Sequence, residues 1–265
     1  MRAFLGFYFF LVVSACGSGG QVGGGGFGGI DNTNVTGRTF SGTSSFLYST
    51  NSPQDVVGKS QDSVTFPSAN QAVITDEFGN KFALTWDPGR RLYVNSVDVT
   101  ALALTDHLDG GPATPDIAYL AWSYGLGSSY PAGSIGVDIW VDGNRTPLGQ
   151  LPQSGSASYA GVVRMTDTAQ NFGDGSIAFF VDFDKSSISG SIDGGLPANG
   201  LARFTILPAQ ISAGAFDSNL VSSDVVVSAN GLHGRFFGAT GNQIGGNFSM
   251  TTSSGDVIGI FGAAE

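Results

Sequence analysis

The sequence predicts an all-β protein, in which a small N-terminal β-sandwich-like unit precedes a C-terminal eight-stranded antiparallel soluble β-barrel. Composition is the first reason: Gly, Ser, Thr, Val, Ile, Phe and Asp dominate, with only two glutamates and three lysines among strong helix formers. Second, no stretch combines apolar residues at helical spacing with residues that could cap a helix. Third, Asp–Gly and Asn–Gly dipeptides, which are typical of hairpin turns, separate short alternating apolar runs.

Residues 1–15 have the features of a lipoprotein signal peptide. A positively charged start precedes an apolar run over residues 3–13, which is shorter than the about 20 residues that span a bilayer. Val13-Ser14-Ala15-Cys16 resembles the lipobox, which lipoprotein signal peptidase cleaves just before the cysteine. Because Cys16 is the only cysteine, we expect it to be acylated. The alternative is an ordinary secretory signal followed by an incidental thiol.

Residues 16–30 then combine the lipidated cysteine with a glycine-rich tether. Residues 17–30 contain nine glycines and few side chains that could fill a core. A flexible coil of this length has a root-mean-square reach of roughly 20 Å. The alternative is a low-complexity tract without a mechanical role. Gly17, rather than Asp, follows the cysteine, and the lipoprotein sorting rule then predicts the outer membrane.

Residues 31–150 are predicted to form the first β unit, the handle-like domain. Residues 71–75 and 81–86 flank a polar turn and predict a hairpin, and residues 134–141 alternate as a half-buried strand does. Residues 104–118 hold two prolines and a Gly–Gly pair and are predicted to be a loop.

Residues 151–265 are predicted to form the barrel as an up-and-down meander. The side chains of Ile177, Phe179, Val181 and Phe183 share one strand face and are expected to fill its interior. The expected strands are residues 156–165, 176–184, 187–192, 201–206, 210–216, 232–237, 244–251 and 256–262.

The charge of the chain restricts its partners. The formal charge is −10, and loss of Arg2 with the signal peptide would make it −11. The net charge argues against nucleic acid, because phosphate recognition needs basic patches, and against electrostatic docking on anionic lipid. An acidic surface remains compatible with solubility or with a basic partner.

Three stretches resemble one family. Residues 140–161 and 181–192 are similar to the barrel entry and second hairpin of transferrin-binding-protein-B-like lipoproteins. Residues 234–248 read GRFFGATGNQIGGNF, where that family usually has Gly-x-Phe-Tyr-Gly-Pro followed by Ala-x-Glu-x-Gly-Gly. The departures are Phe237, Ala239, Gly241 and Gln243.

The resemblance covers residues 119–265 and implies a handle followed by a barrel, held at the outer surface by lipid. Relatives capture transferrin, haemoglobin, haem or a complement regulator, mostly through variable loops. Shared positions such as Phe236 and Phe248 are therefore expected to be core residues.

The sequence predicts no enzyme, no cofactor and no metal site. It lacks the nucleophile-elbow, phosphate-loop and zinc-protease motifs. His107 lies beside two aspartates, which suits a metal site or, as we favour, a solvated acidic loop. Asp182 and Asp184 are expected to be exposed acids flanking a turn, although their pairing is reminiscent of glycosidase carboxylates. Asp142-Gly143-Asn144 lacks the remaining ligands of a calcium loop and predicts a hairpin turn.

One segment carries the candidate contact residues for a ligand or partner: Tyr119, Trp122, Tyr124 and Tyr130. Tyrosine and tryptophan are enriched in interface hot spots, and the Gly/Ser spacing suits a contact loop. The alternative, which we favour, is a strand whose aromatic side chains pack between handle and barrel.

These observations predict a monomeric, non-enzymatic, surface-exposed outer-membrane lipoprotein that binds an unidentified protein or solute, with iron, haem or nutrient acquisition as its role. Two other hypotheses stay open: an envelope-associated structural lipoprotein without a soluble ligand, and a carrier with its ligand inside the barrel. If haem is the ligand, His107, His233 or a tyrosine has to supply the axial bond.

Overall fold

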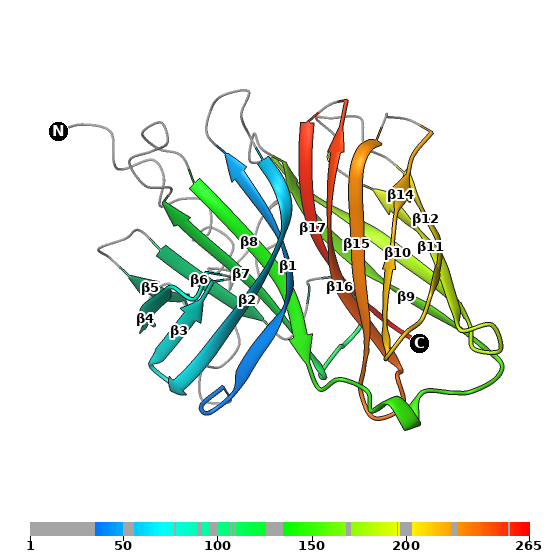
Figure 1. The fold of residues 1–265 in the computed structure, drawn as a ribbon, viewed down its shortest axis with the longest axis horizontal. Helices are drawn as coiled ribbons and strands as arrows, with labels where there is room; N and C mark the ends of the chain where they lie inside the picture. The colour runs from blue at the N-terminus through cyan, green and yellow to red at the C-terminus, as the bar shows by residue number, and fades with distance from the viewer. Residues whose placement is uncertain are drawn as a thin grey trace.

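The computed structural model describes residues 35–49, 56–76, 78–88, 92–95, 100–105, 108, 110–125, 135–167, 171–194, 196, 203–223, 227–253 and 255–265. The predictions for the signal peptide, Cys16, the tether, His107 and Tyr130 lie outside the described residues. All-β architecture is confirmed, with a first β unit followed by a barrel (Figure 1). Among the described residues there is no helix long and apolar enough to cross a membrane.

The first unit is one antiparallel sheet that curls until its two outer strands meet. Each strand pairs with the next one along the chain, and β1 also pairs with β8, where Ser45 lies opposite Ile139. The predicted hairpin is β3 with β4, and the predicted alternating strand is β8. The strands are β1 (Thr39–Ser49), β2 (Val56–Ser68), β3 (Gln71–Thr75), β4 (Lys81–Asp87), β5 (Leu92–Asn95), β6 (Thr100–Thr105), β7 (Ile117–Gly125) and β8 (Ile135–Gly143).

Alternation along these strands sends every second side chain into the curled sheet. The rings of Phe40, Phe66, Tyr93 and Trp140 are fully buried there, with aliphatic residues between them. The Phe66 ring lies 5.9 Å from that of Phe40 and 5.1 Å from that of Tyr93, measured between centroids. Tyr93 Oη donates to the Ala69 carbonyl at 2.8 Å, so its polar end is satisfied inside the core.

One short connection leads into the barrel. After β8, Arg145 makes an isolated antiparallel bridge with Phe237, and a single 3-10 turn, η2 (Leu148–Gln150), follows. Thr146 holds the connection to the barrel: its N–H donates to the Phe236 carbonyl at 3.1 Å and its hydroxyl to the Gly238 carbonyl at 2.8 Å.

The second sheet is the predicted barrel, and it has nine strands in the order β13-β15-β16-β17-β9-β10-β11-β12-β14. Its outermost strands, β13 and β14, are the two shortest. The strands are β9 (Ser156–Asp167), β10 (Phe172–Asp182), β11 (Ser187–Gly194), β12 (Arg203–Gln210), β13 (Ala215–Ser218), β14 (Leu220–Val221), β15 (Val227–Phe237), β16 (Gln243–Thr252) and β17 (Gly255–Ala264).

One predicted strand of the barrel, residues 210–216, is not present as a unit. β12 continues to Gln210, and the chain turns before β13 begins at Ala215. Ala213 and Gly214 both have positive φ, 51° and 70°, which a strand does not contain. The apolar spacing on either side of this turn resembles continuous alternation, so the pattern alone does not show the break.

The barrel interior is filled by phenylalanine. Ile177, Phe179, Val181 and Phe183 are all buried, as the alternation predicts. Phe179 lies 5.7 Å from Phe216 and 5.4 Å from Phe261 between ring centroids. Phe236 and Phe248 are fully buried, which confirms that they are core residues. The side chains of this core therefore occupy the space in which a carried ligand would have to lie.

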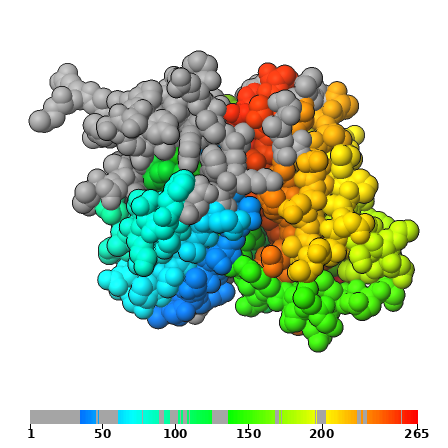
Figure 2. All heavy atoms as spheres, viewed as in Figure 1, coloured from blue at the N-terminus to red at the C-terminus, as the bar shows by residue number. Residues whose placement is uncertain are grey.

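The two units pack against each other along a seam formed by the outer faces of β1, β7 and β8 and those of β16 and β17 (Figures 1 and 2). Its apolar centre includes Leu47, Ile139, Phe237, Ile258 and Ile260. The buried side-chain amides of Gln243 and Asn247 also make hydrogen bonds across the seam. The seam places β7, which carries the predicted contact residues, in the middle of the molecule.

Candidate binding surface

Tyr119 lies in the seam and contacts the barrel. It is fully buried, and its hydroxyl shares a 3.0 Å hydrogen bond with the Thr114 hydroxyl. The ring reaches across to β17 at a position without a side chain, because a Cβ on Gly262 would lie only 1.7 Å from Tyr119 Oη. Burial raises the pKa of Tyr119 well above its ordinary value, so the phenol stays neutral. Tyr119 therefore lies between the first unit and the barrel and contributes to their packing.

Trp122 and Tyr124 lie farther along β7 and pack inside the first unit. Trp122 is 2% exposed, and its ring centroid lies 5.1 Å from Phe82 and 4.3 Å from Tyr124. Tyr124 is half-buried over Gly136, where a Cβ would come within 2.4 Å of its ring. Of the predicted contact residues that the structure describes, only Tyr124 reaches solvent. A role for these four residues in binding stays a prediction.

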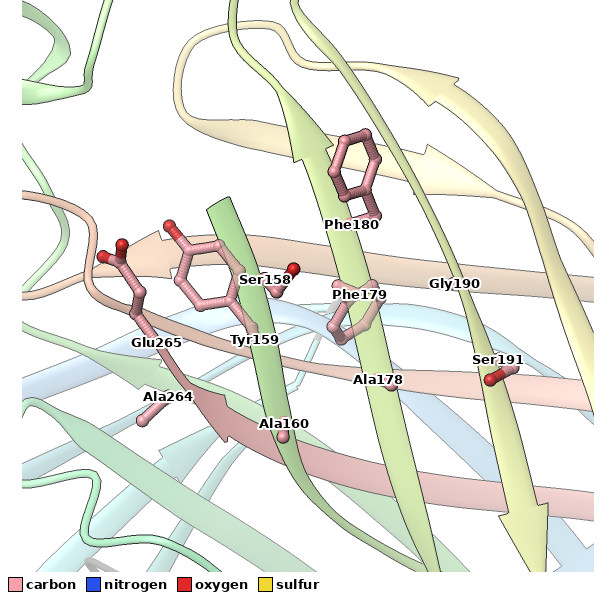
Figure 3. A pocket seen from close by; sticks show the side chains of 10 residues that line it. All are labelled: Ser158, Tyr159, Ala160, Ala178, Phe179, Phe180, Gly190, Ser191, Ala264 and Glu265. Atoms are coloured by element: carbon pink, nitrogen blue, oxygen red, sulfur yellow. The ribbon is translucent and has the colours of Figure 1, made fainter. Parts of the chain in front are cut away.

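An accessible hollow lies on the outer wall of the barrel, across β9, β10, β11 and the end of β17 (Figure 3). Its volume is about 400 Å³. The wall is indented because one cross-strand row carries only small side chains: Ala160 lies opposite Ala178 on one side and Ala264 on the other, and Ala178 lies opposite Ser191.

Phe180 stands beside the hollow, opposite Ser158, and its side chain is 51% exposed. Leu207 on β12 and Val221 on β14 are also exposed on the barrel. Glu265 lines the hollow at the end of the chain. Burial, and then the charge of Glu265, raise the pKa of Tyr159, whose hydroxyl donates to the Gly241 carbonyl at 2.8 Å. An exposed apolar ring beside a hollow of small residues can bind apolar groups of a partner.

A second exposed ring lies at the tip of the β3–β4 hairpin. Phe78 is 80% exposed, on a turn that Asp76 organises: its carboxylate accepts from the backbone N–H of Phe78 at 3.0 Å and of Asn80 at 2.8 Å. Gly79 takes φ +83°, which this turn requires and which other residues rarely adopt. The ring is thus exposed to solvent beside the hydrogen bonds that Asp76 accepts.

The remaining titratable candidates have structural partners. Asp182 accepts from Lys185 Nζ at 2.6 Å at the exposed β10–β11 turn, as expected for turn-flanking acids. The hydrogen bond from Lys185 lowers the pKa of Asp182, and the reciprocal bond raises the pKa of Lys185. His233 Nδ1 is hydrogen-bonded to Asp217 on neighbouring β13. Within the described residues, no three metal-ligating side chains are grouped together.

Sequence reasoning missed Phe78, Phe180 and the seam amides. The alternation of the strand could have predicted that Phe180 is exposed. If the side chains of Phe179 and Val181 point into the barrel, that of Phe180 points outward. The position of Phe78 within the polar turn could likewise have predicted its exposure. No local pattern could have predicted the contacts of Gln243 and Asn247, because their partners are far away in sequence. Gln243 Nε2, for example, donates to Asp116 Oδ2 at 2.8 Å.

The second unit has a family match. Residues 151–265 match the family model of the C-lobe and N-lobe beta barrels of Tf-binding protein B. The match begins where the chain leaves the connecting turn and spans β9 to β17. This part of the chain therefore has the transferrin-binding-protein-B-like barrel fold, which confirms the resemblance predicted from its motifs. None of the curated proteins matches the sequence.

Solved structures give similar but distant matches. A transferrin-binding protein B variant from Haemophilus parasuis is 18% identical, with a TM-score of 0.49 over 85% of this chain and 45% of that one. The isotype 1 protein from serogroup B Neisseria meningitidis is 15% identical, with a TM-score of 0.49 over 84% and 43%. The N-lobe domain of lactoferrin-binding protein B of Moraxella bovis is 12% identical, with a TM-score of 0.38 over 61% and 78%. The chain spans less than half the length of the first two proteins.

Proposed function

We propose that the protein is a surface-exposed outer-membrane lipoprotein, anchored through acylated Cys16, whose folded units bind a protein or a small solute for iron, haem or nutrient acquisition. The observation that carries the proposal is a transferrin-binding-protein-B-like barrel in the same chain as an N-terminal lipobox. The packed barrel interior favours binding on the outside, where Phe180 and the adjoining hollow are accessible.

The first experiment tests anchoring and display. Wild-type protein is expected to take up radiolabelled palmitate and to be degraded when intact cells are treated with proteinase K, with a periplasmic protein as the control for cell integrity. Cys16→Ala should lose the label and the membrane association together. Full protection of the wild-type protein in intact cells would contradict surface display and would favour an envelope-associated structural lipoprotein.

The second experiment tests binding on the barrel wall. A deletion strain is expected to grow poorly under iron limitation and to recover when wild-type protein is restored. Phe180→Glu should fail to restore growth, because a charge beside the hollow opposes apolar contact. Leu148→Glu is the matched control, since Leu148 is an exposed apolar residue on the connecting turn, 62% accessible. Normal growth of the deletion strain would contradict the acquisition role.

Haem is tested separately by a Soret titration of the purified mature protein. A shifted Soret band that His233→Ala weakens would assign haem as the ligand and an imidazole as its axial bond. His233 is one of the two histidines, and in the folded barrel its Nδ1 is already bonded to Asp217. An unchanged Soret band removes haem from the proposal and leaves a protein or another solute.

A further inference from the structure

Two arginines lie at one end of the seam, where the chain passes from the first unit to the barrel. The backbone of Arg145 bridges Phe237 on β15, and Arg235 lies two residues earlier on that strand. Alternate residues of a strand share a face. Arg235 therefore leaves β15 on the same side as Phe237, which packs in the seam.

Arg145 already has partners. Its Nε donates to Asp142 Oδ1 at 2.8 Å, and its Nη2 donates to the Ser41 carbonyl at 2.6 Å. The other oxygen of Asp142 accepts the backbone N–H of Ser41 at 2.8 Å. Each carboxylate oxygen of Asp142 therefore already accepts one hydrogen bond, and both of these bonds hold it beside Arg145 and Ser41.

Arg235 has no such partner. It is half-buried, and within the described part of the chain no hydrogen bond or ion pair reaches its guanidinium. The residues opposite it in the sheet, Ala215 and Gly245, carry no polar side chain. Burial, and then the charge of Arg145, lower the pKa of Arg235, while Asp142 acts in the opposite sense.

An arginine stays protonated at neutral pH, so Arg235 remains a partly desolvated cation near a second one. With Asp142 included, this group keeps one positive charge in excess, in a chain whose formal charge is −10. A guanidinium presents parallel N–H groups that match the oxygens of a phosphate or carboxylate. An oxyanion between the two arginines would supply the missing counter-charge.

We propose that Arg235 and Arg145 form an oxyanion-binding site at the end of the seam, suited to a phosphate group. The phosphate could be the free ion or part of a lipid headgroup, and the experiment below distinguishes these sources. The site is separate from the hollow on the barrel wall, so it does not depend on the proposed function. Its occupation would tie β15 to the segment that joins the two units.

The test is thermal unfolding of the mature protein, purified in detergent, with inorganic phosphate titrated against chloride at equal ionic strength. Phosphate is expected to raise the melting temperature in a saturable manner. Arg235→Gln should shift the titration midpoint at least tenfold, and Arg235→Lys should give an intermediate shift. Arg203→Gln is the matched control, because Arg203 is an exposed arginine paired with Asp193 on another part of the barrel and should leave the midpoint unchanged.

Stability without phosphate gives a second readout. Arg235→Gln removes a half-buried charge that has no hydrogen-bonded counter-ion, so its melting temperature in chloride should equal or exceed that of the wild type. Titration with glycerol 3-phosphate, a soluble headgroup analogue, identifies the source: a midpoint well below that of inorganic phosphate assigns a lipid headgroup, and the reverse assigns the free ion. The proposal is overturned if neither compound stabilises the wild type, if Arg235→Gln responds as the wild type does, or if that variant is destabilised in chloride.

Discussion

The two units of the molecule bury aromatic side chains of different chemistry. The barrel core contains rings without polar atoms, such as Phe179, Phe236 and Phe261. The core of the first unit contains Trp122 and Trp140, and among the described residues neither buried indole Nε1 has a hydrogen-bond partner. A buried donor left without a partner costs about 1–3 kcal/mol. The comparison indicates that the indole rings of the first core carry a donor penalty that the phenylalanine rings of the barrel core cannot incur.

The largest expected loss of stability comes from truncating one buried aromatic side chain in each core. Phe236→Ala should lower the free energy of unfolding by about 3–5 kcal/mol, the usual cost of deleting a buried ring. Trp122→Ala should cost less, because it also removes an unpaired donor worth about 1–3 kcal/mol. Urea denaturation measures both. Equal losses would show that the indole carries no penalty, and a folded Trp122→Ala protein also allows its predicted role in binding to be tested directly.

The next effect concerns the seam that joins the units. Asn247 Nδ2 donates to the Thr43 carbonyl and Asn247 Oδ1 accepts from the Ser45 hydroxyl, both at 2.7 Å. Asn247→Ala leaves these buried groups unsatisfied and should destabilise the protein by about 1–3 kcal/mol. Ser249→Ala, on the same strand, is the control and is expected to cost less. If the Asn247→Ala and Ser249→Ala variants are equally stable, the hydrogen bonds of Asn247 do not couple the two units.

Stability at alkaline pH is expected to depend on a buried tyrosine of the first unit, Tyr93. Burial raises the pKa of Tyr93 from 10.0 to about 12. The folded state therefore holds this proton more tightly, and the stabilisation is complete below pH 10 and is lost as the pH rises toward 12. Stability followed by urea midpoints should fall over that interval, and less steeply in Tyr93→Phe. An unchanged slope in the variant would assign the fall to other tyrosines, such as Tyr119 or Tyr159.

The smallest expected effect is at the hairpin tip. Phe78→Ala should change the free energy of unfolding by less than about 0.5 kcal/mol, because the ring is exposed. Asp76→Ala should cost more, since it removes three hydrogen bonds that organise the turn. Denaturation midpoints of the two variants give the comparison. A Phe78→Ala loss as large as that of Asp76→Ala would show that the ring packs against the protein.

The sequence predicted the barrel more completely than the first unit for a physical reason. Alternation identifies most of the barrel strands, and glycine marks the turn between β15 and β16, where Gly238 and Gly241 both take positive φ. Two barrel turns carry a weaker signal, because Ser186 and Ala213 take positive φ although neither is glycine. In the first unit, Tyr119 and Trp122 have the residue types of a contact site, and only the register of β7 with its neighbours shows that they are buried.

The closed pairing of β1 with β8 has a consequence for how copies of the protein meet one another. A free sheet edge offers unpaired N–H and C=O groups to the edge of a neighbouring molecule, which is a common route to aggregation. The first sheet has no such edge among its described strands, because β1 pairs on both sides. The edges of the second sheet are β13, with four residues, and β14, with two. Strands of that length offer few hydrogen-bonding groups, so pairing of a second copy with β13 or β14 is expected to be weak.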